Sequence, residues 1–223
     1  MIIDHFLAKG RVEEVVSGIY AVFIENNYDR AMLFCRYQEY YESPFVEIKN
    51  KNFTLEEYMK IYSNKNESPY FTYPNDWSGF NIPSDVLIQA FKRFSLIPNG
   101  YDEVMALIIE YCQKTTDSKK WYLIGVDDSG DTNTMNHEIA HGLYYTNLEY
   151  KREMDDIIKT FQLNEYKFFE KELKDLGYSL NPDIISDEIQ AYLATEPYHQ
   201  WDQTICKKYQ KDFEKVFFKY YEV

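Results

Sequence analysis

The fold is decided by two neighbouring stretches, WYLIGV at positions 121–126 and NHEIAHG at positions 136–142. The first is a short apolar run of aromatic and β-branched residues, which is typical of a strand. The second belongs to a segment, 133–145, whose apolar residues recur at helical spacing. Turn-forming residues at 127–131 separate the two stretches. The sequence therefore predicts a strand that leads through a turn into a helix carrying His, Glu and His.

Helical patterns dominate the chain after this point. Apolar spacing predicts helices over 148–161 and 165–176, the second of which ends at Gly177 in a C′ position. Asn181 and Pro182 are typical of the N-cap and first residue of a helix, here extending to about 195. A final helix is expected over 201–221. The C-terminal half should therefore be almost entirely helical.

The N-terminal half has a mixed pattern. Residues 12–24 are apolar and β-branched with a break at Ser17-Gly18, and they fit either a helix or strands. Helices are expected over 28–41, from the capping box at Thr54 to about 62, from Ser84 as cap to 94, and over 101–112. We therefore predict an α+β protein in one domain, 1–223, with a mixed part at 1–130 containing the sheet and a helical part at 131–223.

The stretch 68–81 is irregular and rich in aromatic residues. Its aromatic side chains could cover a substrate cleft, or they could pack in the core of the first part of the chain, which is the more common role. They are Tyr70, Phe71, Tyr73, Trp77 and Phe80.

Composition excludes several classes of protein. The 223 residues are 45% hydrophobic and 18% aromatic, which excludes global disorder. The net charge of -13, from 24 basic and 37 acidic residues, disfavours nucleic acid as a partner. Apolar runs are too short to span a membrane, and Asp4 lies where a signal peptide needs a basic residue, so we expect a cytoplasmic protein, with leaderless export left open. The three cysteines, Cys35, Cys112 and Cys206, are odd in number and far apart, and we expect them to be core thiols.

The spacing of His137 and His141 predicts a metal site. Residues four apart lie on one face of a helix, so both imidazoles can bind the same ion, and zinc accepts such ligands in a tetrahedral set. Glu138 is placed to reach a water on that ion and to act as its general base. Because the surrounding helix is apolar, two buried imidazoles and a carboxylate would be costly without a shared cation. We therefore predict one zinc ion at this helix.

A third protein ligand has to come from another part of the chain. Glu188 is the preferred candidate, because it lies in the middle of an apolar helix where a carboxylate needs a partner. Asp187 and His199 remain alternatives.

The pattern His137-Glu138-x-x-His141 followed by a helical glutamate resembles the gluzincin branch of the zincin metallopeptidases. The resemblance covers about 121–195. It implies a zincin-like fold, with a mixed sheet packed on the active-site helix and a helical lower part. It also implies His137, His141 and Glu188 as zinc ligands and Glu138 as general base. In the thermolysin type an aspartate four residues after the glutamate orients a ligand histidine, and here Tyr192 occupies that position.

The combined pattern predicts a zinc metallopeptidase that hydrolyses a peptide or protein substrate with a water activated by Glu138. Two alternatives are a non-catalytic zincin-like binding or regulatory module, and a zinc hydrolase that acts on a non-peptide amide or ester. Donors to the oxyanion could come from Tyr192, Tyr198 or His199, which follow the glutamate.

Overall fold

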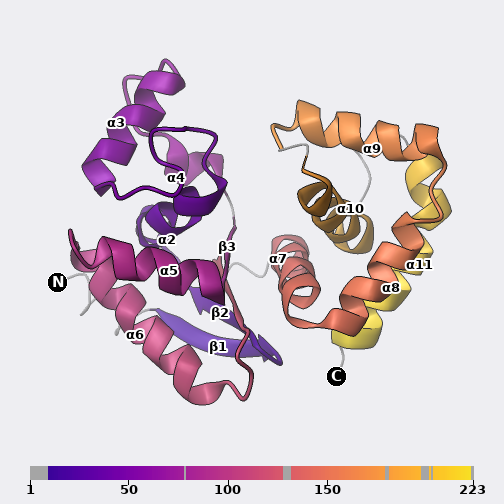
Figure 1. The fold of residues 1–223 in the computed structure, drawn as a ribbon, viewed down its shortest axis with the longest axis horizontal. Coiled ribbons are helices and arrows are strands. Elements are labelled where there is room, and N and C mark those ends of the chain that lie inside the picture. The colour runs from indigo at the N-terminus through magenta and orange to yellow at the C-terminus, as the bar shows by residue number, and fades with distance from the viewer. Residues whose placement is uncertain are drawn as a thin grey trace. The chain divides into compact units, whose positions relative to one another are not determined.

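The computed structural model describes residues 10–77, 79–127, 132–178, 181–196, 201 and 203–221. The chain divides into two compact units, Met1–Thr134 and Met135–Val223 (Figure 1). Strands occur in the described residues of the first unit, and the described residues of the second are helical. The protein is therefore α+β, with a small mixed sheet and mostly helical content. None of the helices in the described part of the chain is both long and apolar enough to cross a membrane.

The first unit is built around a four-stranded sheet with the strand order β1-β2-β4-β3. The strands are β1 (Arg11–Val16), β2 (Ile19–Phe23), β3 (Phe80–Pro83) and β4 (Tyr122–Val126). The two central strands, β2 and β4, run parallel, and each edge strand is antiparallel to its neighbour. The central strands are buried almost throughout, which explains why both consist of apolar runs without polar alternation.

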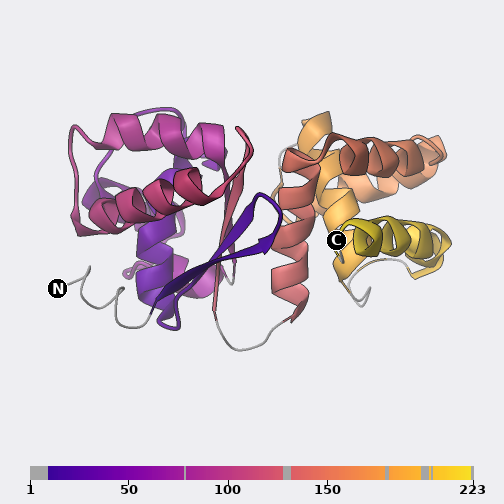
Figure 2. The same cartoon turned by 90° about the horizontal axis from the view of Figure 1, so that it is seen from below.

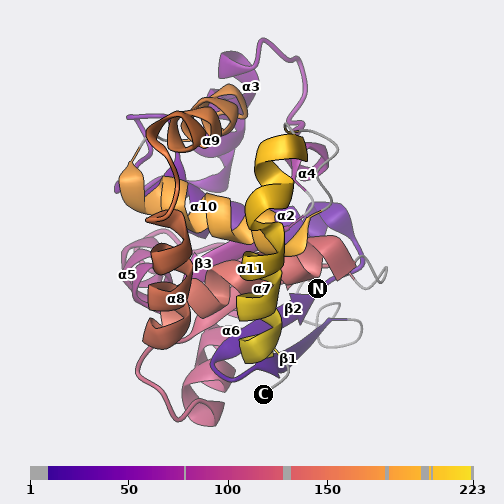
Figure 3. The same ribbon diagram turned by 90° about the vertical axis from the view of Figure 1, so that its right-hand side faces the viewer.

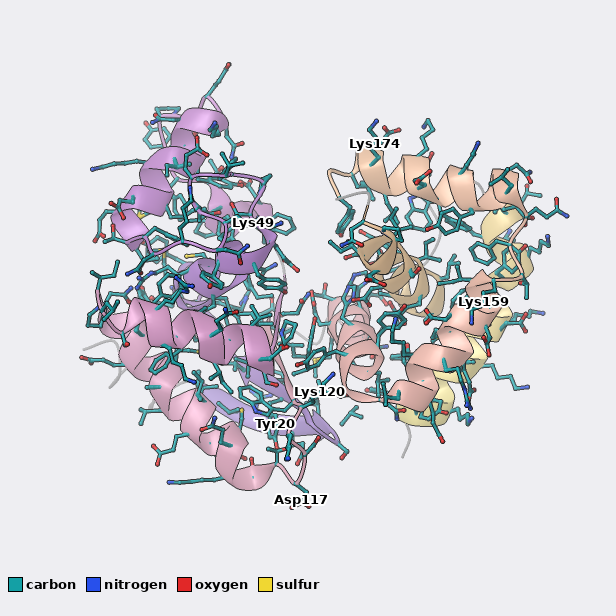
Figure 4. The ribbon with its side chains drawn as sticks, in the orientation of Figure 1. Tyr20, Lys49, Asp117, Lys120, Lys159 and Lys174 are labelled. Carbon is teal, nitrogen blue, oxygen red and sulfur yellow. The ribbon has the colours of Figure 1, made fainter. Side chains whose placement is uncertain are left out.

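The ambiguous segment 12–24 forms a β-hairpin, β1–β2 (Figure 2). Gly18 has φ 76°, a left-handed conformation that glycine adopts without steric cost, and it turns the chain between the strands. In β2, Tyr20 (labelled in Figure 4) packs edge-on against Tyr111 and Trp121, each at 6.2 Å between ring centroids. The hairpin is therefore anchored to the core through its second strand.

Five helices accompany the sheet in the described part of the first unit. They are α2 (Asn27–Glu42), α3 (Leu55–Lys65), α4 (Tyr73–Asp76), α5 (Ser84–Phe94) and α6 (Gly100–Thr115). The central one, α2, is buried along most of its length and packs on β3 and β4. Its Phe34 ring lies against Gly125 so closely that a Cβ at Gly125 would be 2.5 Å from Phe34 Cε2. The glycine in the strand WYLIGV is therefore required by the close approach of α2.

Most of the aromatic residues in 68–81 pack in the core. Tyr73 and Phe80 are buried, and Phe71 stacks on Tyr73 at 5.8 Å, whereas Tyr70 and Trp77 are exposed. The core-packing interpretation is thus confirmed for the three inner rings. The side chains of Cys35, Cys112 and Cys206 are also buried, as expected.

The second unit consists of five helices in its described residues, beginning with α7 (Thr132–Thr146), which starts just before the division between the units. The others are α8 (Leu148–Ile158), α9 (Leu163–Asp175), α10 (Pro182–Thr195) and α11 (Gln203–Tyr221). Helix α10 packs on α8, α9 and α11, and α8 lies beside α11 (Figure 3).

Several predicted boundaries were wrong by a few residues. Helix α8 ends at Ile158 and α9 begins at Leu163, where Gln162 N donates to Glu165 Oε2 at 2.8 Å. Ser84 is the first helical residue of α5 and not its cap. Its backbone N–H donates to Trp121 O, and its hydroxyl accepts from Trp121 N, so the residue joins the start of β4 instead of capping the helix. The predicted turn at 127–131 lies outside the described residues beyond Asp127.

Candidate metal centre

Helix α7 presents His137 and His141 on the same face. Both residues are buried, with 9% and 4% of their surface exposed. Their Nε2 atoms lie 3.1 Å apart, and their rings meet edge to face with 4.8 Å between centroids. The spacing of four residues therefore brings two nitrogen atoms to one point, as the sequence pattern predicts.

Helix α10 brings Glu188 to the same point. Asn181 Oδ1 accepts from Asp183 N and Pro182 opens the helix, while Ile185 and Ile189 fix its buried face. Glu188 Oε2 then lies 3.9 Å from His137 Nε2 and 3.7 Å from His141 Nε2. The three side chains form a group, His137, His141 and Glu188, that could hold a metal ion.

Two further carboxylates contact the outer nitrogens of the imidazoles. His141 Nδ1 donates to Asp187 Oδ1 at 2.8 Å, and His137 Nδ1 lies 3.0 Å from Glu196 Oε1. A carboxylate beside Nδ1 favours the proton on that nitrogen, which leaves the Nε2 lone pair available to a metal ion. Asp187 thus holds the Nδ1 side of His141 and turns its Nε2 toward Glu188. His137 Nδ1, in contrast, makes no hydrogen bond among the described residues despite its short distance to Glu196.

The electrostatics of the group are unfavourable without a cation. Among the described residues, Glu188 Oε2 has no hydrogen-bond donor, and burial raises the pKa of Glu188. Burial opposes the charged form of His141, but Asp187 and Glu188 outweigh it and raise the pKa of His141 to about 10. The site therefore attracts a positive charge, which a proton or a metal ion can provide.

The distances between the three inner atoms fit a metal ion of the size of zinc. Ligand atoms of tetrahedral zinc lie about 3.3 Å apart, given bonds of about 2.0–2.1 Å. The separations here, 3.1, 3.7 and 3.9 Å, bracket that value.

Glu138 is buried in α7 beside the two histidines. Its charge helps to raise the pKa of Glu188 and of His141, so its carboxylate acts on the same small region. A buried carboxylate outside the ligand group is what a general base at this site requires.

Two tyrosine hydroxyls lie at the edge of the group. The Tyr192 ring packs edge-on against His137 with 4.8 Å between centroids, and its hydroxyl is 3.2 Å from that of Tyr178. Burial and the nearby Glu188 raise the pKa of both phenols, that of Tyr192 to about 12. Both hydroxyls therefore remain protonated and can donate hydrogen bonds.

Tyr178 reaches this position because of the way α9 ends. Gly177 has φ 96°, Gly177 N donates to Lys174 O, and Tyr178 N donates to Leu173 O, which is the Schellman pattern. The glycine at C′ indicated the end of the helix, but nothing in the sequence showed that the next side chain would meet Tyr192.

The structure separates the candidates for the third ligand. Glu188 faces both Nε2 atoms, whereas Asp187 contacts the far side of His141. His199 and Tyr198 lie outside the described residues. Sequence reasoning missed the contact of Glu196 with His137, since Glu196 follows α10 and only tertiary packing brings it to the ring.

No protein-family model, no curated protein and no solved structure matches this chain.

Proposed function

We propose that this protein is a zinc-dependent metallohydrolase with a zincin-like arrangement of ligands, and that it cleaves peptide bonds. The observation that carries the proposal is the convergence of His137 Nε2, His141 Nε2 and Glu188 Oε2, with no donor to the Glu188 oxygen among the described residues. A buried set of acceptors facing one point requires a cation. Two imidazoles and one carboxylate are the ligand set of many catalytic zinc sites.

Each residue then has a defined task. Zinc, when bound by His137, His141 and Glu188, supplies Lewis acidity and makes a water more acidic. Glu138 accepts a proton as the water oxygen bonds to the carbonyl carbon, and it returns the proton to the amine nitrogen as the carbon–nitrogen bond breaks. Because the hydroxyls of Tyr192 and Tyr178 share one hydrogen bond, one of them is available as a donor to the carbonyl oxygen when it becomes negatively charged.

Glu138 favours an enzyme over a binding module. A site that only binds metal needs ligands and no base, whereas a hydrolase needs a carboxylate that can accept a proton from the water. The alternative of a non-peptide amide or ester substrate uses the same residues, so it is tested by the choice of substrate.

The test combines metal content with turnover. Mass spectrometry of protein purified without a metal-affinity tag should find about one zinc per chain, lost in His141→Ala and Glu188→Ala. With a peptide library as substrate, Glu138→Gln should keep zinc and lose about 10²–10⁴-fold in turnover. Glu149→Gln, at an exposed position on α8, is the matched control and should retain full activity.

Each contrary result has a defined meaning. Absence of zinc from the wild type after reconstitution would overturn the proposal. Full turnover by Glu138→Gln would overturn the assigned base. Hydrolysis of activated esters without cleavage of any peptide would move the substrate to the non-peptide class.

A further inference from the structure

A chain of hydrogen bonds, partly exposed at Asp187 and buried at Tyr150, extends from the proposed metal centre to helix α8. Asp187 Oδ1, which accepts from His141 Nδ1, also accepts from Gln190 Nε2 at 3.0 Å. Gln190 Oε1 in turn accepts from the Tyr150 hydroxyl at 2.7 Å. Tyr150 and Gln190 are both fully buried. Four residues from three helices are thus linked in one line.

The hydrogen bonds converge on Asp187 from both sides. The Tyr150 hydroxyl donates to the amide oxygen of Gln190, so the amide N–H₂ group faces Asp187. An ionised carboxylate can only accept, so Asp187 takes hydrogen bonds from Gln190 and from His141 Nδ1. The proton of His141 is therefore held on Nδ1, and its Nε2 lone pair faces the metal position.

The outer end of the line is firmly held. Tyr150 N donates to Asn147 Oδ1 at 3.0 Å in the first turn of α8. The Tyr150 ring packs at a right angle against Tyr220 of α11, with 5.6 Å between centroids. Leucine and phenylalanine would fill this space without any polar group to satisfy, so the buried amide and hydroxyl need an explanation beyond packing.

We propose that Gln190 and Tyr150 are positioning residues of the metal centre, which hold Asp187 so that His141 keeps its proton on Nδ1 and binds zinc through Nε2. The inference rests on the proposed zinc site, and it adds that affinity for the metal is set partly from α8. Partners that lie behind a metal ligand typically contribute about 10–100-fold to metal affinity. Three hydrogen bonds separate Tyr150 from the ligand His141, so its share should be near the lower figure.

The experiment measures two properties of the full-length chain: its zinc dissociation constant, by competition with a chelator, and the solvent exchange of the His141 Nδ1 proton, by NMR. Tyr150→Phe removes one hydroxyl and keeps the ring. We expect it to weaken zinc binding about tenfold and to speed exchange of the Nδ1 proton. Gln190→Met should have a larger effect on both. In the double variant, Tyr150→Phe should add nothing to Gln190→Met, because the line is already broken.

Tyr209→Phe is the matched control. The Tyr209 hydroxyl also donates to a buried carboxylate of the same unit, Glu165, and among the described residues no hydrogen bond joins this pair to the histidines. The two tyrosine variants should lose similar stability, and only Tyr150→Phe should change zinc affinity.

The outcomes distinguish this inference from the proposed function. Zinc binding that is unchanged in Tyr150→Phe and Gln190→Met, together with unchanged proton exchange, would overturn the inference and leave the function standing. A wild type that binds no zinc, but whose Nδ1 proton responds to Tyr150→Phe as expected, would overturn the function and support the hydrogen-bond line.

Discussion

Two buried carboxylates, Asp102 in the first unit and Glu188 in the second, have opposite surroundings. Asp102 accepts from Arg36 Nη1, Tyr37 Oη and Asn99 N, each at 2.7 Å. Glu188 Oε2 has no donor among the described residues and faces two imidazole nitrogens. Asp102 is thus held by three hydrogen-bond donors of its own chain, whereas Glu188 faces two imidazoles that bind either protons or a metal ion.

The difference separates a structural charge from a candidate functional one. A buried ion pair with several donors joins helices, here α2 and α6, and needs nothing from solution. A buried carboxylate grouped with lone pairs destabilises the fold until a cation arrives. Matched substitutions of acid by amide should therefore act in opposite directions at the two sites.

The largest effect is expected for Asp102→Asn. The variant leaves the buried Arg36 without its counter-charge, so the free energy of unfolding should fall by about 3 kcal/mol. Chemical denaturation measures the change, and Asp117→Asn, an exposed residue labelled in Figure 4, is the control. Added zinc should not restore the loss. If the variant were as stable as the wild type, the ion pair of Asp102 with Arg36 would not stabilise the fold, and the contrast with Glu188 would fail.

An intermediate effect is expected for Glu165, a carboxylate with donors in the same unit as the metal centre. Hydrogen bonds from Lys208 and Tyr209 lower the pKa of Glu165 to about 2. Because the pKa is lower when folded, its contribution is present above the unfolded value, about 4.3, and is lost as the pH falls toward 2. Glu165→Gln should cost about 2 kcal/mol at neutral pH, and less at pH 2. Equal losses at both pH values would contradict the prediction.

The smallest effect, of opposite sign, is expected for Glu188→Gln. Since burial raises the pKa of Glu188, the ionised form is disfavoured in the folded protein. In the presence of a chelator, and at a pH above about 10 where His141 is neutral, the variant should therefore be more stable than the wild type by about 1 kcal/mol. Zinc should stabilise only the wild type, by about 2.7 kcal/mol at a hundred times its dissociation constant. A destabilised variant under chelator would show that Glu188 is held by partners of its own.

Local patterns explain what could be predicted from the sequence. The α+β class, the strand before α7 and the helix around His137 and His141 follow from periodicity and spacing within a few residues. The segment 12–24 was ambiguous, because short β-branched runs with a glycine fit more than one structure.

The surroundings of the site depend on which helices pack together. Sequence spacing does not predict the contacts that Asp187, Glu196 and Tyr178 make, because their partners lie in other turns or helices. Asp187 shows this best, because it was weighed as a ligand and instead contacts the opposite side of His141.

Because β2 pairs in parallel with β4, the centre of the sheet cannot close until nearly all of the first unit has been synthesised. The helices between the two strands depend on local contacts and can form while β4 is still in the ribosome. The apolar face of β2, with Tyr20 and Val22, has no central partner during that interval. The two histidines of α7 are made soon after β4, and Glu188 follows later, so the ligand set is completed only once the sheet is able to close. Synthesis thus delivers the sheet first and the three proposed metal ligands last.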